Sequence, residues 1–370
     1  MRFNMTGGRE RQNMLEIWAK TGKAKFVPVF IHALKDRTPA VRKTAAEVLG
    51  KFRDDRSIDP IANTVLNDTE PEIREAAALA LGAIGDARAC KALVPVLKDK
   101  NIKVRRSAAV ALRDLNWRTN DPQERALFTI AMGRPDAAWR EGEAAVEPLL
   151  SELGSETVAF RRSAVSALEG IRDERAIGPL VAALKDPDVT VRVSAVHALG
   201  SIGGDRANAE LLELIHDESH HVRLAAADAL RKMWQGHFVP YFVVLLSDPH
   251  FEIRIVSAEA LGKSGDPEAV EPSMAALKDD DADVRRLAAQ ALGRLRDRRA
   301  ISGLVESLTD RESEVRHAAA NSLQVIDLEW RMSEAAQGVI PHLESALNDR
   351  EYWVRQSAAK ALSHIRGNLP

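Results

Sequence analysis

Aspartate and arginine recur along this chain at a fixed spacing that could support either catalysis or structure. An aspartate stands six residues before an arginine in nine of ten copies of a repeated phrase, and Ser155 replaces it in the other copy. A row of carboxylates could serve acid–base catalysis, and a carboxylate facing a guanidinium forms a strong hydrogen-bonded pair. A catalytic group occurs once, whereas this pair recurs with every period. We therefore interpret it as a structural ladder, typified by Asp186, Arg192, Asp217, Arg223, Asp248 and Arg254.

Histidine and cysteine are the other residues that could carry chemistry. His216, His220 and His221 lie close together, with His250 about one repeat later. Imidazoles bind zinc, but a turn separates His216 from His220, so one helical face does not present both, and metal binding is left open. Cys90 occupies a position that is aliphatic in other copies, which indicates a core residue. We assign no catalytic, cofactor-binding or metal-binding residue from the sequence.

The elements that position these residues follow from the repeat itself. The phrase (V/I)R-x-x-A-A-x-A-L-G recurs with its arginines mostly 31 residues apart, and each period holds two apolar patterns of helical spacing. We call these two helices A and B; the arginine lies in the first turns of helix B. Because one hairpin cannot bury its apolar face alone, stacking must create the core. The ten arginines are Arg42, Arg74, Arg105, Arg161, Arg192, Arg223, Arg254, Arg285, Arg316 and Arg355.

The spacing also predicts the organisation of the chain. Residues 1–23 are expected to form an entry helix, and residues 24–370 a single solenoid. Two intervals exceed the period by eight residues or more, which places insertions at about 114–146 and 327–338. Ser155 predicts a weak joint beside the first insertion, because the ladder carboxylate is missing there. Prolines early in helix A and glycine–aspartate turns after helix B, such as Gly85-Asp86 and Gly265-Asp266, fit the boundaries of such helices.

The repeated phrase resembles HEAT repeats of the short prokaryotic type first noted in phycobilin lyases, over roughly residues 24–366. The resemblance implies an all-α, right-handed α-solenoid of about ten hairpins whose concave face, lined by helix B, binds other proteins. Deoxyhypusine hydroxylase is similar in repeat pattern, but its His-Glu metal ligands have no counterpart in this sequence. HEAT-like DNA glycosylases need a strongly basic groove, whereas acidic residues interrupt the groove expected here. The resemblance therefore implies a fold more strongly than an activity.

Binding specificity must come from the positions that the repeat leaves free. On helix B these are one, five and nine residues after the arginine, which share a face because they are four apart. At the first position Val193, Leu224 and Ile255 replace polar residues in three successive repeats. We predict that they form an apolar strip for a partner, although neighbouring side chains could instead cover them. Flanking basic residues and one aromatic side chain complete the predicted partner site: Arg106, Arg162, Arg286 and Phe251.

Composition narrows the function classes. The 370 residues include 52 Lys and Arg against 54 Asp and Glu, and this balance argues against a dedicated nucleic-acid binder. A single cysteine cannot form an internal disulfide, and neither a signal-peptide pattern nor an 18-residue apolar stretch occurs. We expect a soluble, cytoplasmic protein without a membrane segment.

We predict a non-enzymatic scaffold or adaptor that needs no cofactor and binds a peptide or protein segment on its concave face. One alternative is a factor resembling phycobilin lyases that handles a bilin or a phycobiliprotein. Another is weak binding to a nucleic-acid backbone, which predicts steep salt dependence. The partner, the pathway, the oligomeric state and the role of the 114–146 insertion are not encoded in any motif of the sequence.

Overall fold

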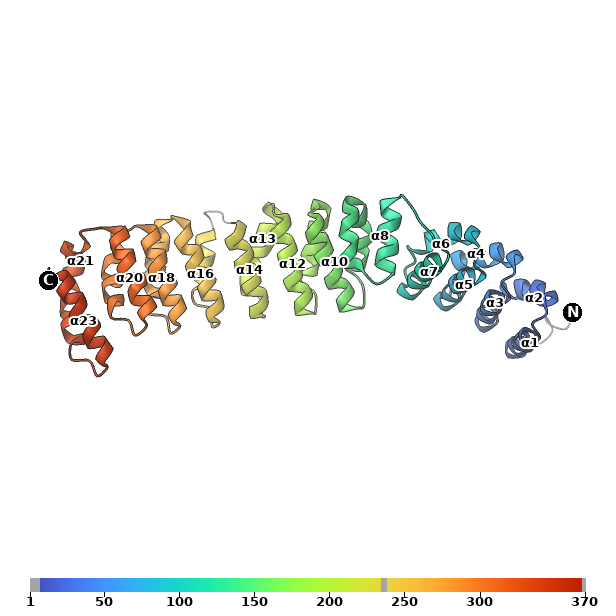
Figure 1. Ribbon diagram of the computed structural model, residues 1–370, viewed down its shortest axis with the longest axis horizontal. Helices are drawn as coiled ribbons and strands as arrows, with labels where there is room; N and C mark the ends of the chain where they lie inside the picture. Colours follow the sequence, from blue (N-terminus) through green and yellow to red (C-terminus); the bar gives the residue numbers. More distant parts are fainter. Residues whose placement is uncertain (1–6, 234–237, 368–370) are drawn as a thin grey trace. The chain divides into compact units, whose positions relative to one another are not determined.

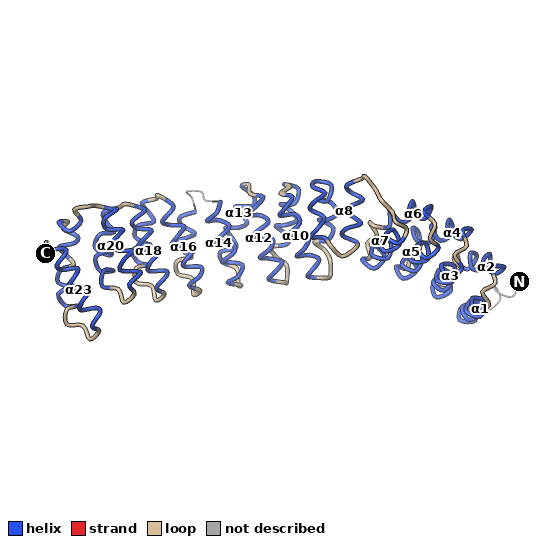
Figure 2. The backbone as a smooth tube through the Cα atoms, in the orientation of Figure 1, coloured by secondary structure: helices blue, strands red, loops and turns tan. Residues whose placement is uncertain are grey.

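The computed structural model describes residues 7–233 and 238–367, and these residues form helices and turns without a β-strand (Figures 1 and 2). The described helices are neither long nor apolar enough for any of them to cross a membrane. The chain divides into two compact units, Met1–Pro179 and Leu180–Pro370, and α11 (Ile177–Ala183) contains the boundary. Each unit stacks helical hairpins, as the predicted all-α solenoid requires. The predicted single solenoid of residues 24–370 stays a prediction.

Unit 1 begins with an entry helix and continues with four hairpins. In its hairpins helix A is α2, α4, α6 or α9, and helix B is α3, α5, α7 or α10. The first insertion adds α8 and the irregular 3₁₀ segment η5 before the last hairpin. The bounds are α1 Gly8–Lys20, α2 Val27–Ala33, α3 Pro39–Phe52, α4 Ile58–Asn67, α5 Pro71–Ile84, α6 Cys90–Val96, α7 Ile102–Asp114, α8 Pro122–Ala131, η5 Pro135–Ala145, α9 Val146–Glu152 and α10 Val158–Ile171.

Unit 2 continues the same alternation. Helices B pack on one another in chain order, and Figure 1 shows α12, α14, α16, α18 and α20 side by side. The second insertion adds the 3₁₀ turn η12 and α21. The bounds are α12 Val189–Ile202, α13 Asp205–Glu213, α14 His220–Met233, α15 Val239–Leu245, α16 Phe251–Ser264, α17 Val270–Ala276, α18 Ala282–Leu295, α19 Ile301–Glu306, α20 Ser313–Ile326, η12 Trp330–Met332, α21 Glu334–Gly338, α22 Ile340–Ala346 and α23 Tyr352–Ile365.

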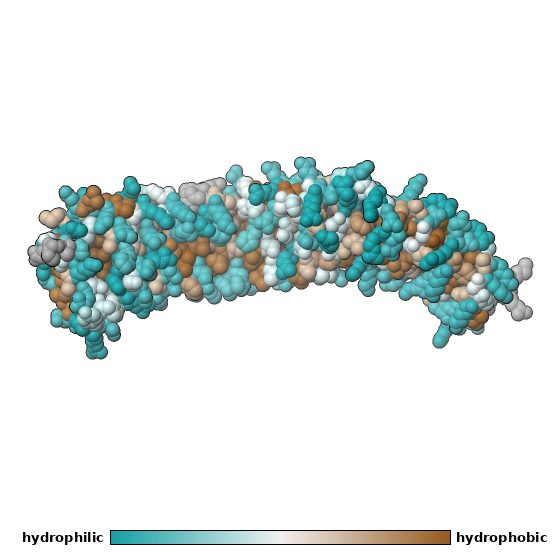
Figure 3. All heavy atoms as spheres, in the orientation of Figure 1, coloured by the Kyte–Doolittle hydropathy of each residue, from teal (hydrophilic) through white to brown (hydrophobic). Residues whose placement is uncertain are grey.

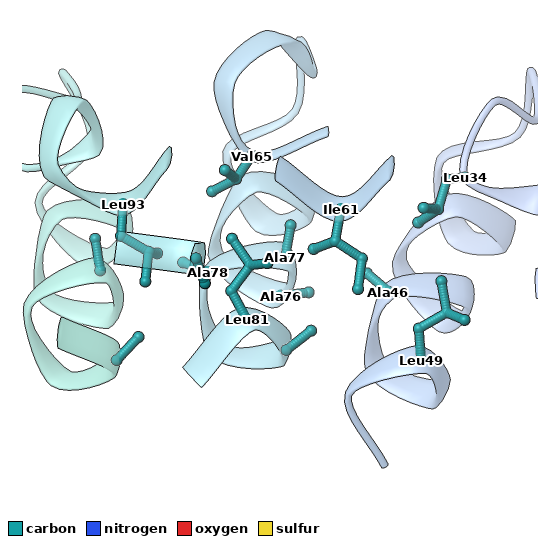
Figure 4. Packing of buried hydrophobic residues seen from close by; sticks show 14 of the residues in the cluster. Leu34, Ala46, Leu49, Ile61, Val65, Ala76, Ala77, Ala78, Leu81 and Leu93 are labelled. Carbon is teal, nitrogen blue, oxygen red and sulfur yellow. The ribbon is translucent and has the colours of Figure 1, made fainter. Parts of the chain in front are cut away.

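The core is built from the apolar positions that the repeat fixes. The leucine seven residues after each arginine is buried in all ten copies, from Leu49 to Leu362. The alanines three and four residues after the arginine lie beside it, as Figure 4 shows for Ala77, Ala78 and Leu81 of α5 together with Ile61 of α4. Since burying a leucine side chain contributes about 2 kcal/mol, the repeated leucine is a main source of stability in each hairpin.

Glycine and aspartate end and begin the helices where the sequence predicted. Gly85 and Gly265 follow α5 and α16 with φ of 84° and 66°, the left-handed conformation that closes a helix. Asp86 and Asp266 then accept the backbone N–H of Arg88 and Glu268, which caps the 3₁₀ turn leading into the next helix A. These capping predictions are confirmed.

Successive helices B approach so closely at one position that only glycine fits without movement. A Cβ built on Gly262 of α16 would lie 2.6 Å from Cα of Ala291 in α18. The equivalent glycine of α3, Gly50, would place a Cβ 2.8 Å from Cα of Ala80. At the step from α14 to α16 the position holds Arg231, whose guanidinium reaches Glu259 of α16 at 3.5 Å. An ion pair therefore replaces the close glycine contact at that step.

Candidate functional site

The aspartates and arginines of the repeat pair between neighbouring hairpins. Arg223 donates from Nε to Asp248 Oδ2 at 2.6 Å and from Nη2 to Oδ1 at 3.1 Å. Arg192 and Asp217 make a single, longer contact of 3.5 Å. Two-point pairs of the same kind also join Arg42 to Asp68, Arg74 to Asp99, Arg254 to Asp279 and Arg285 to Asp310.

Each ladder aspartate also ties down its own hairpin. Asp248 Oδ1 accepts the N–H of His250 at 2.9 Å, and the carbonyl oxygen of Asp248 accepts Nη1 of Arg254 at 2.9 Å. Asp186 does the same for Asp188 and Arg192. One aspartate thus binds the first turn of helix B and the arginine six residues later in the same hairpin. Asp248 also binds Arg223, the arginine of the preceding hairpin. The carboxylates are occupied by the stack, which favours the structural interpretation over the catalytic one.

These contacts set the protonation of the ladder. Burial alone would raise the pKa of Asp248, but the hydrogen bonds from Arg223 and from the His250 N–H hold it below the ordinary value. The pKa values of Asp36 and Asp99 are lowered against burial in the same way, by Arg11 and Arg74. Asp36, Asp99 and Asp248 are therefore charged at neutral pH.

We expect acid to weaken the stack through these aspartates. Because the folded-state pKa lies below the unfolded value of about 3.9, each aspartate stabilises the fold above that pH and loses its contribution as pH falls further. The free energy of unfolding, measured with urea, should stay nearly constant above about pH 5 and decrease below about pH 4. Asp248→Asn should be less stable than the natural chain at pH 7, with a difference that shrinks between pH 4 and pH 2. A difference independent of pH contradicts the expectation.

The gap in the ladder at Ser155 is filled from another element. Arg105 donates from Nη2 to Glu152 Oε1 at 2.6 Å, and Glu152 is the last residue of α9 rather than part of the turn. Burial raises the pKa of Glu152, and the charge of Arg105 opposes that rise. The arginine of α7 thus keeps a carboxylate partner beside the insertion, where the sequence predicted a weak joint.

The ladder begins one helix earlier than the sequence analysis recognised. Arg11 of α1 donates from Nε and Nη2 to Asp36 at 2.8 and 2.9 Å. Arg11 stands 31 residues before Arg42, one full period, which is the signal that could have revealed it. Trp18 of the same helix stacks on Phe26, with ring centroids 5.4 Å apart. The entry helix α1 is therefore equivalent to a helix B.

The face left free by the ladder carries grooves between successive helices B. In unit 1 a groove of about 730 Å³ between α3 and α5 is lined by Lys43, Glu47 and Lys51, which are the positions one, five and nine after Arg42. A groove of about 580 Å³ lies between α1 and α3. In unit 2 grooves of about 500 and 410 Å³ lie between α18 and α20 and between α20 and α23. The variable positions of the repeat thus line open concavities.

The predicted strip lies at equivalent positions of three neighbouring helices. Val193 of α12, Leu224 of α14 and Ile255 of α16 are each half-buried, and Ile255 packs against the core of unit 2. In the view of Figure 3, apolar side chains gather among polar ones near α16. The strip is therefore partly covered by its neighbours and partly open to solvent. The sequence allowed either a fully open strip or a covered one, and the structure lies between the two.

The other predicted partner residues differ in availability. Phe251, the first residue of α16, is 44% exposed. Arg106 and Arg162 are exposed on helices B of unit 1, whereas Arg286 is half-buried and pairs with Asp283 of its own helix at 2.7 Å. Leu79, five residues after Arg74, and Val325, nine residues after Arg316, occupy variable positions that were not selected from the sequence, and they are 46% and 51% exposed. Side-chain exposure depends on neighbouring hairpins, which the repeat pattern does not show.

The histidine group is a stack of rings. The ring of His220 lies 4.1 Å from that of His250, nearly parallel, and 3.9 Å from that of His221. Burial and then the neighbouring imidazoles lower the pKa of His220. Within residues 7–233 and 238–367, no three His, Cys, Asp or Glu side chains are arranged to hold a metal ion. Cys90 packs against the core of unit 1, and burial raises the pKa of its thiol.

The first insertion reaches the variable face of unit 1. Trp139 of η5 is 49% exposed, and its side chain lies 3.7 Å from where a Cβ would stand on Gly170 of α10. Gly170 is nine residues after Arg161, so it occupies the third of the three variable positions on helix B. Trp139 lies within the insertion predicted at about 114–146, whose role the sequence left open. The glycine in a row of larger side chains was the available signal.

Comparisons with known proteins agree with this geometry. A family model described as HEAT repeats matches residues 9–65, 27–113, 59–145, 146–231 and 239–324, and a model described as HEAT repeat matches residues 339–365. No curated protein matches the sequence.

Solved structures with a similar chain course share little sequence with this one. A crystal structure of an engineered protein is 23% identical over 92% of this chain and 98% of that one, with a TM-score of 0.42. Kap95p, from a study of its binding to RanGDP, is 15% identical over 98% of this chain and 59% of its own, with a TM-score of 0.42. Human deoxyhypusine hydroxylase is 23% identical over 73% and 96%, with a TM-score of 0.30.

Proposed function

This chain belongs to the HEAT-repeat family, and we propose that it is a scaffold that holds a segment of another protein on the face formed by its helices B. The observation that carries the proposal is the set of grooves between successive helices B, lined by the side chains that the repeat does not fix. The residues that the repeat does fix are engaged in the core and the ladder. Variation is thus concentrated on the surface available to a partner.

We further propose that the partner contacts unit 2 through the strip of Val193, Leu224 and Ile255 and through Phe251. Their partial exposure offers apolar area beside polar side chains, which is the composition of a peptide-binding groove. We propose binding without catalysis, since the repeated carboxylates are tied to arginines and serve the stack.

The experiment is peptide selection followed by measured affinity. The purified chain is panned against a random peptide library, and the selected peptides are labelled for fluorescence anisotropy. The triple variant Val193→Ala, Leu224→Ala, Ile255→Ala should bind them at least about tenfold more weakly, because it removes apolar contact area from the proposed binding surface. Phe251→Ala should weaken binding in the same direction.

The matched control is Val244→Ala, which truncates an aliphatic residue of helix A in α15 that is 52% exposed. It should leave affinity unchanged, and circular dichroism melts should show that each variant folds. Selected peptides that bind the triple variant as tightly as the natural chain contradict the assignment to the strip. Failure to select any specific peptide contradicts the proposed scaffold function.

A further inference from the structure

The last groove of unit 2 is lined by several basic side chains. It lies between α20 and α23, has a volume of about 410 Å³, and includes Arg316, His317, Arg331, Lys360, His364 and Trp330 in its lining. No aspartate or glutamate of the described residues lines it, whereas the groove between α3 and α5 contains both signs of charge. The volume falls within the range of ligand sites, and we call this groove the C-terminal pocket.

Arg316 reaches the pocket because the second insertion removes its ladder partner. Arg285, one repeat earlier, donates hydrogen bonds from Nε and Nη2 to the carboxylate of Asp310. In most of the ladder the aspartate follows the arginine by 25 or 26 residues, but Asp349 follows Arg316 by 33. Arg316 keeps its bonds from Nη1 to the carbonyl oxygens of Asp310 and Arg311, at 2.7 and 3.0 Å, and no carboxylate of the described chain pairs with it.

Aromatic rings hold the two arginines of the pocket. The guanidinium carbon of Arg316 lies 5.7 Å from the ring centroid of Trp353, and that of Arg331 lies 5.8 Å from the ring centroid of Trp330. Nε of Arg331 is buried without a hydrogen-bond partner. A buried donor without an acceptor is costly, so an incoming oxygen that accepted this N–H would gain the stabilisation that the free protein lacks.

We propose that the C-terminal pocket binds carboxylates of an acidic segment of a partner protein, a proposal that rests on the scaffold function above. The ladder supplies the precedent, since the same arginine position binds an aspartate carboxylate at 2.7 to 3.1 Å in the preceding step. An aspartate or glutamate of the partner occupies the place of the missing ladder carboxylate at Arg316. Lys360 and Arg331 bind further negative charge, and Leu308 contacts apolar side chains between the acids.

The test uses a fluorescein-labelled peptide of alternating glutamate and leucine, and a second peptide with glutamine in place of glutamate. Fluorescence anisotropy should show the acidic peptide binding at least about tenfold more tightly than the glutamine peptide, with affinity falling as salt is raised. Arg316→Gln, Arg331→Gln and Lys360→Glu should each weaken binding of the acidic peptide about tenfold or more.

Lys360→Glu is the decisive variant, because Lys360 is exposed and its replacement leaves the ladder intact. Its matched control is Arg350→Glu, the same change of charge at an exposed turn residue of the same hairpin outside the pocket, which should bind as the natural chain does. Equal binding of the two peptides, or equal loss in the two variants, overturns the proposal. Displacement of the peptide by inorganic phosphate, with no preference for glutamate, also overturns it and indicates a phosphate site.

The strip variant separates this proposal from the scaffold function. The triple variant Val193→Ala, Leu224→Ala, Ile255→Ala should retain the acidic peptide, because none of these residues lines the C-terminal pocket. If selected peptides ignore the strip while the acidic peptide still requires Lys360, the strip assignment fails and the pocket stands. The reverse result removes the pocket and leaves the strip.

Discussion

Gly262→Val should destabilise unit 2 by about 3 kcal/mol, the upper end of what overpacking usually costs. A Cβ at Gly262 would stand 2.6 Å from Cα and 2.7 Å from Cβ of Ala291, so α16 and α18 must separate to admit it. Backbone cannot turn aside as a flexible side chain can, and the separation also strains the neighbouring pair of Arg254 and Asp279. Urea unfolding of the variant and the natural chain measures the difference.

The control for Gly262→Val is Gly338→Val. Gly338 is also helical, in α21, but no atom of a neighbouring element lies within 4 Å of its built Cβ. It should change stability by less than about 1 kcal/mol, since only helix propensity is altered. Gly262→Ala should fall between the two. Similar losses for Gly262→Val and Gly338→Val would show that close approach of helices B is not what the glycine provides.

Removing one partner of a ladder pair should cost about 3 kcal/mol, because it leaves the other charge poorly solvated. Arg285 and Asp310 suit the test, since their side chains are only 6% and 11% exposed and they make two hydrogen bonds. We expect Arg285→Met and Asp310→Ala each to lower the free energy of unfolding by about this amount. The double variant should lose clearly less than the sum of the two.

The exposed pair of Lys278 and Glu306 provides the comparison. Its atoms are 3.9 Å apart, and its side chains are 79% and 42% exposed. Lys278→Met and Glu306→Ala should each cost about 1 kcal/mol or less, as solvated ion pairs do. Additive losses at Arg285 and Asp310, or losses equal to those of the exposed pair, would show that the ladder does not bind the hairpins together.

Part of the proposed binding surface could be predicted from the sequence, and part depended on irregularities in the repeat. The rows at one, five and nine residues after the arginine do line the groove between α3 and α5. The strip was placed on the correct helices, but its half-burial was not evident, because exposure is set by side chains of the adjoining hairpins. The insertion before Asp349 was visible in the sequence, but only the structure showed that Arg316 is left without a carboxylate partner among the described residues and lines a pocket.

The sequence by itself determined the hairpin, its period and the residues that pack one hairpin on the next. It did so because leucine, alanine, glycine, aspartate and arginine recur at spacings dictated by helix geometry. Tertiary structure alone decided what occupies the places where the pattern is broken: Glu152 in place of a missing aspartate, Trp139 over Gly170, and no carboxylate of the described residues at Arg316. The reason is that regular contacts depend on separation along the chain, which periodicity reveals, whereas substitutes come from any side chain that folding brings near.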